Sequence, residues 1–399
     1  MSVQDASSAP TLGVGMVGYA FMGAAHSQAW RTAGRVFDLP LDVRMTVLCG
    51  RSRDGAEAAA RKLGWESVET DWKALVARDD VRLVDICTPG SSHAEIAIAA
   101  LAAGKHVLCE KPLANTVSEA RAMVEAARAA RAAGVRSMVG FNYRRVPAAT
   151  LARQLIAGGR IGTVRHVRAQ YLQDWIVDPE FPLVWRLRAE EAGSGALGDI
   201  GAHIVDLTQF VTGQRLTGVN AMLETFVKQR PLPAASSGLS ASGGTSMGDV
   251  TVDDAAVFFG RLDGGALASY EATRFATGRK NSIRVEVNGS TGSLAFDLER
   301  LNELELYESA GTSDAGEEGF RRILVTEPTH PYLGAWWPPG HTLGWAESFT
   351  HEVKDLVEAV AAGTDPSPSF EDGLQVQLVL EAVQRSAADR GCWTDVEAL

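Results

Sequence analysis

Residues that can do chemistry stand at two points of the chain, and the first follows a short apolar run. The run 107–109, Val-Leu-Cys, is typical of a buried parallel strand, and Glu110, Lys111 and Pro112 follow it directly. In an open α/β sheet, ligands bind beyond the carboxyl ends of the strands. A charged pair there, followed by a residue that fixes the backbone, indicates a site. Taken alone, the three residues also fit a surface ion pair before a helix.

The second point is the pair Asp199 and His203, within the run 193–206 that begins with small residues. In a helix, residues four positions apart lie on one face. An aspartate at a helix start also serves as an N-cap, and a lone histidine is often a hydrogen-bonded core residue, so spacing alone leaves both interpretations open. Asp206 stands one turn further on and can steady His203. No other ligand cluster accompanies the pair, so we predict no metal site.

A glycine-rich turn near the N-terminus predicts a dinucleotide site. Gly13-x-Gly15-x-x-Gly18 matches the fingerprint literally, but it puts two glycines inside the strand 12–17. The second register, Gly18-Tyr-Ala20-Phe-Met-Gly23, falls at the strand-to-helix turn, where phosphate meets free N–H groups. We therefore prefer the second register.

The end of the next strand bears on the choice of cofactor. NAD-specific sites usually place an acid here for the ribose 2′-OH, but this chain has Gly50, then Arg51, Ser52 and Arg53. This pattern favours NADP slightly over NAD, although it also fits a solvated helix start.

Strands and helices that alternate over 11–140 position these motifs. Strands are expected at 12–17, 43–48, 82–87, 107–109 and 135–139, and helices at 54–63, 72–77, 94–103 and 118–133, the last capped by Ser118. This alternation predicts a doubly wound parallel sheet of the Rossmann type, in an α/β protein.

The second half reads as an α/β domain with antiparallel strands. Strands are expected at 164–171, 255–262, 266–272, 283–287 and 293–296, and helices at 147–159, 199–211, 345–361 and 373–388, before an extended piece at 392–396. We expect 231–248 to be a mobile Ser/Gly-rich loop and 311–319 an exposed loop. Trp336 and Trp337 lie on a Pro-rich loop and either stack on a sugar ring or pin that loop to the core.

Composition sets the class of protein. The chain has 399 residues, 46 % hydrophobic and 22 % charged, which predicts two soluble domains. A net charge of −11 argues against nucleic acid and anionic membranes as partners. We expect no secretory signal and no membrane span, so the location is cytoplasmic. Cys49, Cys87, Cys109 and Cys392 form no C-x-x-C pair and are expected to be small buried residues.

Several motifs together resemble one family. They are Gly18-x-Ala-x-x-Gly23, Thr88-Pro89, His93, the segment 104–112 that ends in Glu-Lys-Pro, and Gly140-Phe-Asn-Tyr-Arg144. In this combination the chain resembles the glucose–fructose oxidoreductase / inositol dehydrogenase / rhizopine catabolism family over essentially its whole length. The resemblance implies a flexible start at 1–10, a Rossmann domain at 11–145, and a substrate domain at 146–399 with a large open, mostly antiparallel sheet. Closing helices at 345–390 are expected to pack back on the first domain.

The resemblance also implies an activity and its residues. Family members mostly oxidise or reduce a sugar or polyol hydroxyl with NAD or NADP, in a cleft between the domains of a homodimer or homotetramer. His203 is then the base, and its place near a helix start favours the neutral imidazole. Lys111 stabilises the alkoxide and relays the proton, and Asp199 orients either group or binds a second hydroxyl. The cofactor residues expected are Gly18, Ala20, Phe21, Met22, Gly23, Arg51, Ser52, Thr88, Pro89, His93, Glu110 and Lys111. The substrate residues expected are Tyr143, Arg144, Asp174, Trp175, Arg186, Asp199 and His203.

Two other functions also fit the fold. A regulatory protein that kept the fold should lack the lysine or the histidine, and both are present. An NAD-dependent glycosidase of the same fold generally departs from the Glu-Lys-Pro pattern, which is intact here. An oxidoreductase is therefore the preferred prediction.

Overall fold

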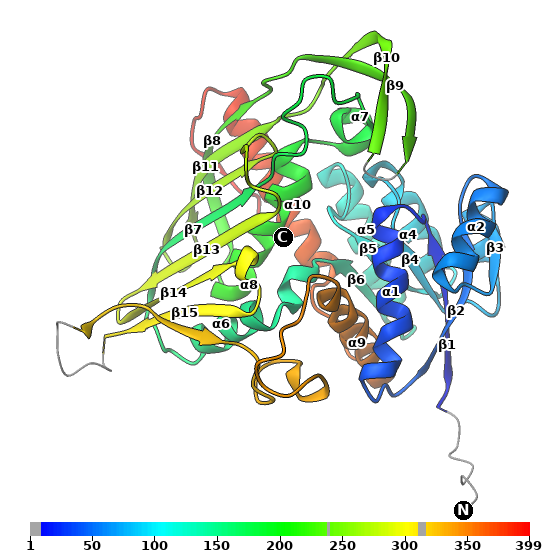
Figure 1. Cartoon of the computed structure of the whole chain (residues 1–399), viewed down its shortest axis with the longest axis horizontal. Coiled ribbons are helices and arrows are strands. Elements are labelled where there is room, and N and C mark those ends of the chain that lie inside the picture. Colours follow the sequence, from blue (N-terminus) through cyan, green and yellow to red (C-terminus); the bar gives the residue numbers. More distant parts are fainter. Residues whose placement is uncertain (1–8, 238–239, 310–316) are drawn as a thin grey trace, which may run out of the picture. The chain divides into compact units, whose positions relative to one another are not determined.

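The computed structural model describes residues 9–237, 240–309 and 317–399 (Figure 1). The chain divides into two compact units. Unit 1 comprises 1–113, 118–140 and 346–373, and unit 2 comprises 114–117, 141–345 and 374–399. Within the described ranges, no helix has the length and apolar character that crossing a bilayer requires.

Unit 1 contains the predicted parallel sheet. Its strands are β1 (Thr11–Val17), β2 (Asp42–Cys49), β3 (Ser67–Glu69), β4 (Leu83–Ile86), β5 (His106–Glu110) and β6 (Ser137–Gly140), in the order β3-β2-β1-β4-β5-β6. This order is that of the Rossmann fold, with the switch between β1 and β4. Strands β1, β4 and β5 are almost wholly buried, because helices cover both faces of such a sheet.

The helices of unit 1 follow the strands, with one from much later in the chain. They are α1 (Phe21–Val36), α2 (Arg53–Leu63), α3 (Trp72–Val76), α4 (His93–Ala102), α5 (Val117–Arg131) and α9 (Ala346–Ala362). Helix α9 packs along α1, where the ring of Phe349 lies 5.3 Å from the ring of His26 (Figure 1). Helix α5 begins at Val117, so Ser118 lies in its first turn and is not its cap.

Unit 2 contains the nine-stranded sheet. Its strands are β7 (Val164–Leu172), β8 (Leu216–Glu224), β11 (Ala255–Leu262), β12 (Leu267–Thr273), β13 (Ser282–Gly289), β14 (Gly292–Asp297), β15 (Glu303–Glu308), β16 (Arg321–Leu324) and β17 (Thr394–Asp395), in the order β16-β15-β14-β13-β7-β12-β11-β8-β17. The described pairs are antiparallel except β7 with β12. The mostly antiparallel sheet expected from the sequence is therefore confirmed.

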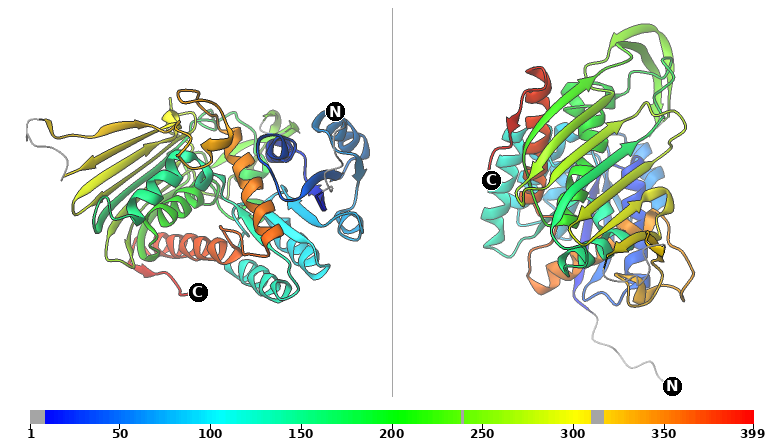
Figure 2. Two further views of the ribbon diagram at one scale, coloured as in Figure 1. Left: turned by 90° about the horizontal axis from the view of Figure 1, so that it is seen from below. Right: turned by 90° about the vertical axis from the view of Figure 1, so that its left-hand side faces the viewer.

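Helices cover one face of this sheet. They include α6 (Pro147–Ala157), α8 (Ala202–Thr212) and α10 (Phe370–Ala388), and a short α7 (Ala189–Ala192) lies elsewhere in the unit. In Figure 2, α6 and α8 lie against one face while the strands of the other face are open to view. The open face exposes apolar side chains, among them Met222 at 76 % and Phe259 at 58 %.

Three expectations for unit 2 need correction. Residues 231–237 and 240–248 lie in the paired strands of a β-hairpin, β9 (Gln229–Ser237) with β10 (Ser240–Asp249), where a mobile loop was expected; residues 238 and 239 lie outside the described residues. Asp199 is no N-cap, because it lies in a π-helical turn, Leu197–Gly201, that runs directly into α8. Cys392 is exposed, whereas the other three cysteines are buried as predicted. Of the loop predicted at 311–319, residues 311–316 lie outside the described residues.

Candidate functional site

The turn after β1 has the geometry that a dinucleotide phosphate needs. Gly18 has φ +96°, and a Cβ there would lie 2.8 Å from the Cys87 carbonyl oxygen. A Cβ at Gly23 would lie 2.2 Å from the Gly18 carbonyl oxygen. Helix α1 then starts after Ala20 with no side-chain cap, which leaves its first N–H groups for an anion. The residues present therefore fit a pyrophosphate at this turn.

The two glycines of the literal motif have other tasks. Gly13 and Gly15 lie inside β1, where a Cβ at Gly13 would lie 1.9 Å from the Asp80 carbonyl oxygen and one at Gly15 would meet the side chain of Leu75 at 2.8 Å. Both glycines are thus explained by close packing within unit 1.

The end of β2 shows why an acid is missing there. A Cβ at Gly50 would lie 1.9 Å from the Tyr19 ring, so this ring leaves no room for a side chain. Ser52 caps α2 by accepting a hydrogen bond from the Gly55 N–H (3.3 Å). Arg51 is exposed beside them. The glycine at this position is accounted for by packing, whichever cofactor binds.

The segment around Lys111 is held by buried side chains. The Glu110 carboxylate accepts the backbone N–H of Lys111 (3.0 Å) and lies 2.9 Å from Nε2 of His26. His93 is 1 % exposed, and its two ring nitrogens lie 3.0 Å from the Pro112 carbonyl and 2.9 Å from the Thr88 carbonyl. Burial lowers the pKa of His93. His93, predicted to bind the cofactor, thus joins the ends of β4 and β5 through its ring.

In unit 2, His203 lies among aromatic rings on α8. Its ring is 4.7 Å from that of Tyr143, 5.9 Å from that of Tyr171 and 6.0 Å from that of Phe141, and the residue is 7 % exposed. Such surroundings exclude water and hold the imidazole in one orientation. Phe141 and Tyr143 follow β6 in sequence, and Tyr171 stands on β7.

A chain of hydrogen bonds continues from these rings. The Tyr143 hydroxyl lies 3.0 Å from the Tyr171 hydroxyl, which donates to Oδ1 of Asn281 (2.7 Å). Gln173 donates to the same oxygen (2.8 Å), and Trp345 donates to the Tyr143 hydroxyl (3.3 Å). Burial, with help from Tyr143, raises the pKa of Tyr171 well above its ordinary value, so this phenol stays protonated and is able to donate.

Two residues far away in sequence, Arg274 and Asp253, hold Asp199 and the turn that carries it. Arg274 is fully buried, and its guanidinium lies 3.6 Å from the Asp199 carboxylate and 5.6 Å from the Trp175 ring centroid. Asp253 accepts the N–H groups of Gly195 (2.8 Å) and Leu197 (2.7 Å), which fixes the start of the π-helical turn. Arg274 and Asp253 could not be recognised from the sequence, since nothing local links them to Asp199.

The other predicted substrate residues make contacts of their own. Arg144 is buried and forms an ion pair with Asp206 (2.5 Å), the residue predicted to steady His203. Asp174 accepts from Lys280 (2.7 Å) and from the Gly278 N–H (3.0 Å), and Lys280 lowers its pKa. The Arg186 guanidinium stacks over the Trp185 ring at 4.4 Å. Tyr143 packs against the His203 ring, and Trp175 lies beside Arg274, whose guanidinium pairs with Asp199.

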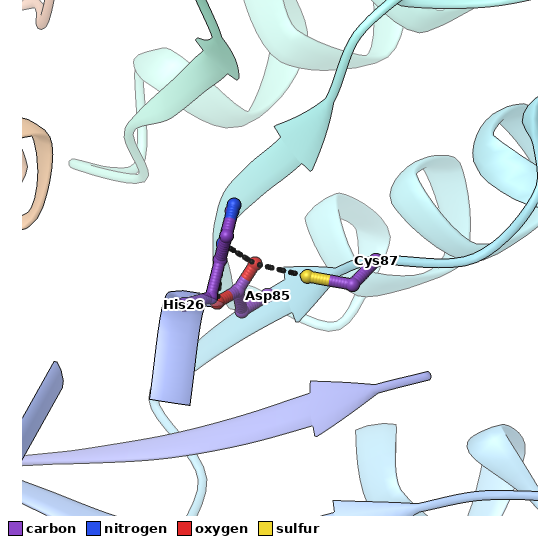
Figure 3. A group of neighbouring side chains, drawn as sticks. All are labelled: His26, Asp85 and Cys87. Carbon is purple, nitrogen blue, oxygen red and sulfur yellow. Dashed lines mark hydrogen bonds and ion pairs between the residues drawn. The ribbon is translucent and has the colours of Figure 1, made fainter. Parts of the chain in front are cut away.

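One group of metal-ligating residue types occurs within the part of the chain that the structure describes. It comprises His26, Asp85 and Cys87, all buried in unit 1 (Figure 3). His26 and Cys87 both hydrogen-bond to the Asp85 carboxylate.

Comparison with known proteins matches both halves of the chain. The model of an oxidoreductase family with an NAD-binding Rossmann fold, GFO/IDH/MocA, matches residues 12–141, and that of the GFO/IDH/MocA C-terminal domain matches residues 150–295. Levoglucosan dehydrogenase of Pseudarthrobacter phenanthrenivorans is 42 % identical over 96 % of this chain and 98 % of its own length.

Solved structures agree with this assignment. The oxidoreductase domain protein of Kribbella flavida is 64 % identical, with a TM-score of 0.92 over 98 % of this chain and 100 % of that one. A levoglucosan dehydrogenase in complex with NADH and levoglucosan is 41 % identical, with a TM-score of 0.91 over the same shares, and a further complex holds NADH and L-sorbose. With the Rossmann sheet and the mixed nine-stranded sheet described above, the chain belongs to the GFO/IDH/MocA family of oxidoreductases, as its motifs suggested.

Proposed function

We propose that this protein is an NAD(H)-dependent dehydrogenase that acts on a secondary hydroxyl of levoglucosan or of a closely related sugar. The observation that carries the proposal is the 42 % identity to levoglucosan dehydrogenase along nearly the whole of both chains. The cluster around His203 supports it, because buried aromatic rings and amide groups suit the apolar faces and hydroxyls of a sugar ring.

The proposed roles follow from the chemistry of alcohol oxidation. His203 accepts the hydroxyl proton, and the aromatic rings around it keep bulk water from competing. The Lys111 ammonium stabilises the developing alkoxide. Asp199, held by Arg274, orients the substrate through a second hydroxyl or orients the other two groups. The nicotinamide, when bound, supplies the acceptor for the hydride that leaves the same carbon.

The cofactor is proposed to bind at the turn after β1, with its phosphates against Gly18 and the start of α1. The slight preference for NADP expected from the sequence is the alternative to NAD(H) in this proposal and stays a prediction. It now rests on the exposed Arg51, because packing against Tyr19 accounts for Gly50 and Ser52 caps α2. Titrating both cofactors decides it: NAD binding tighter by about tenfold or more, some 1.4 kcal/mol, would remove the preference.

The function is tested by following absorbance at the reduced-nicotinamide band. The protein is mixed with NAD or NADP and one compound at a time: levoglucosan, L-sorbose, myo-inositol, glucose and methyl glucoside. We expect reduction of NAD with levoglucosan at the highest kcat/KM. Release of nitrophenolate from p-nitrophenyl glycosides would point to the glycosidase. Tight cofactor binding with no turnover of any compound would point to a regulatory protein.

The homodimer or homotetramer expected from the family resemblance also stays a prediction. The apolar side chains on the open face of the nine-stranded sheet support it, since Val257 and Met222 are neighbours there on β11 and β8. Light scattering during size-exclusion chromatography measures the mass directly.

A further inference from the structure

His26 on α1 is buried between two carboxylates of the parallel sheet. Its Nδ1 lies 3.0 Å from both carboxylate oxygens of Asp85 on β4, and its Nε2 lies 2.9 Å from Oε1 of Glu110 on β5. The exposed fractions of these residues are 1 %, 0 % and 4 %. Figure 3 shows His26 with Asp85 and Cys87. A fully buried charge is costly unless it is paired. Strong interactions must therefore offset the desolvation of these groups, or the arrangement must serve a function.

With Asp85 and Glu110 both ionised, each ring nitrogen of His26 must carry a proton. Carboxylate oxygens accept hydrogen bonds, so both nitrogens donate and the ring is an imidazolium. Burial lowers the pKa of His26, but Asp85 and Cys87 raise it more, and the result lies well above the ordinary value. Trp30 Nε1 also donates to Oδ2 of Asp85 (2.7 Å), and Cys87 Sγ lies 3.5 Å from Oδ1 of Asp85.

The same residue types are those of a metal site, but the distances are those of hydrogen bonds. In a zinc site the cysteine ligand is a thiolate. Here burial raises the pKa of the Cys87 thiol, which keeps it protonated.

The Glu110 carboxylate connects this cluster to Lys111. Its other oxygen, Oε2, accepts the backbone N–H of Lys111 at 3.0 Å. The residue after Lys111 is fixed as well, because the Pro112 carbonyl lies 3.0 Å from Nδ1 of the buried His93. The backbone of Lys111 is thus held on both sides by residues that stand on different elements.

We propose that His26 is a positioning residue for Lys111, acting through the Glu110 carboxylate. The role assigned to Lys111 in turnover rests on the proposed function, whereas the link from His26 to Lys111 does not. Misplacement of a reacting group by about 1 Å can cost 10²-fold in rate, so fixing the lysine in this way has a measurable consequence.

Two substitutions separate the two sides of the imidazole. In His26→Gln the amide nitrogen reaches the place of Nε2 and can still donate to Glu110. In His26→Asn the amide reaches only the place of Nδ1 and serves Asp85. Trp30→Phe is the matched control, because it removes a donor to Asp85 and leaves Glu110 alone.

The expected results follow from the Glu110 link. His26→Asn should lower kcat at least tenfold while the dissociation constant of the cofactor changes less than threefold, and His26→Gln should lose clearly less kcat. Trp30→Phe should lower the midpoint of urea unfolding and leave kcat within twofold. If kcat follows the unfolding midpoint across all three variants, His26 is merely structural and the proposal is wrong.

A second measurement does not need turnover. The rate at which acetic anhydride labels the Lys111 amine is measured by peptide mass spectrometry, with the exposed Lys62 as internal reference. We expect His26→Asn to change the Lys111 rate at least threefold relative to Lys62, and His26→Gln to change it less. Equal labelling in all variants overturns the proposal even if the enzyme is active. An inactive wild type with the expected labelling overturns only the proposed function.

Discussion

Individual side chains give the sharpest predictions, beginning with Lys111 and His203. If both handle the substrate proton, Lys111→Ala and His203→Ala should each lower kcat by roughly two to four orders of magnitude, the usual range for a positioned acid–base group. The dissociation constant of the cofactor in His203→Ala should stay near that of the wild type. Steady-state kinetics and a cofactor titration check this. A His203→Ala enzyme that retains more than a tenth of kcat would remove the histidine from the mechanism.

A second prediction at this scale concerns His106 and acid stability. Burial, together with Arg82 and Arg136, lowers the pKa of His106 to about 4, and its Nδ1 accepts the Arg136 N–H (3.0 Å). Between pH 6.5 and 4 the unfolded chain binds a proton at this residue that the folded chain does not. The free energy of unfolding should therefore fall as pH falls through that window.

The asparagine variant isolates this effect. His106→Asn keeps an acceptor for the Arg136 N–H but does not titrate. As pH falls, the free energy of unfolding of His106→Asn should fall less steeply than that of the wild type. The two slopes should differ by up to about 1 kcal/mol per pH unit, because one proton is linked to unfolding. Urea titrations at pH 4.5, 5.5, 6.5 and 7.5 measure both slopes. Identical slopes for the two proteins would assign the acid sensitivity to other groups.

At the scale of elements, the turn between β1 and α1 makes the next prediction. Gly18 has φ +96°, which residues with a side chain rarely adopt, and the Cβ of Gly18→Ala would also meet the Cys87 carbonyl. The turn must therefore shift, and the affinity for the cofactor phosphates should fall by tenfold or more. Gly34→Ala in the same helix is the control, because its nearest neighbour lies 3.9 Å away. That change should leave binding intact and stabilise the helix by up to about 1 kcal/mol. Calorimetric binding and thermal unfolding compare the two, and equal affinities would place the phosphates elsewhere.

Sequence reasoning succeeded for elements whose signals are local. Five of the six strands of the Rossmann sheet follow from apolar runs punctuated by glycines, whereas the short β3 was not predicted, and β11 was predicted with its observed bounds, 255–262. It failed for the hairpin of β9 and β10, because a run of Pro, Ser and Gly has no strand pattern. That hairpin is anchored from elsewhere: the fully buried Arg230 donates to the carbonyls of Ile176 (2.6 Å) and Asp178 (2.7 Å).

The candidate site shows the same division. The types and spacing of Asp199 and His203 are visible in sequence, but the π-helical turn that carries Asp199 is not, since Asp253 fixes it through hydrogen bonds to residues 58 and 56 positions away. Tyr171, Asn281 and Arg274 likewise join the site only through tertiary packing. Gly50 has a second explanation that the local sequence could not reveal, because a Cβ there would meet the Tyr19 ring.

At the scale of the whole molecule, the proposed chemistry is divided between the two units. Lys111 belongs to unit 1, at the end of β5, whereas Asp199 and His203 belong to unit 2. The chain passes between the units several times, so neither half of the sequence holds a complete set of the proposed catalytic groups. If the three residues act on one substrate, their contributions to the rate must depend on one another.

A double-mutant cycle tests that dependence. The effects of residues that act as one unit are not additive. The loss of rate in the Lys111→Ala/His203→Ala protein should therefore be smaller than the product of the two single losses by at least tenfold. The matched comparison pairs His203→Ala with Gly34→Ala, which lies in α1 and should combine multiplicatively. Single-turnover rates at saturating sugar avoid confusion with product release. Multiplicative losses for Lys111 and His203 would mean that they serve different steps, and Lys111 would then be assigned to cofactor binding alone.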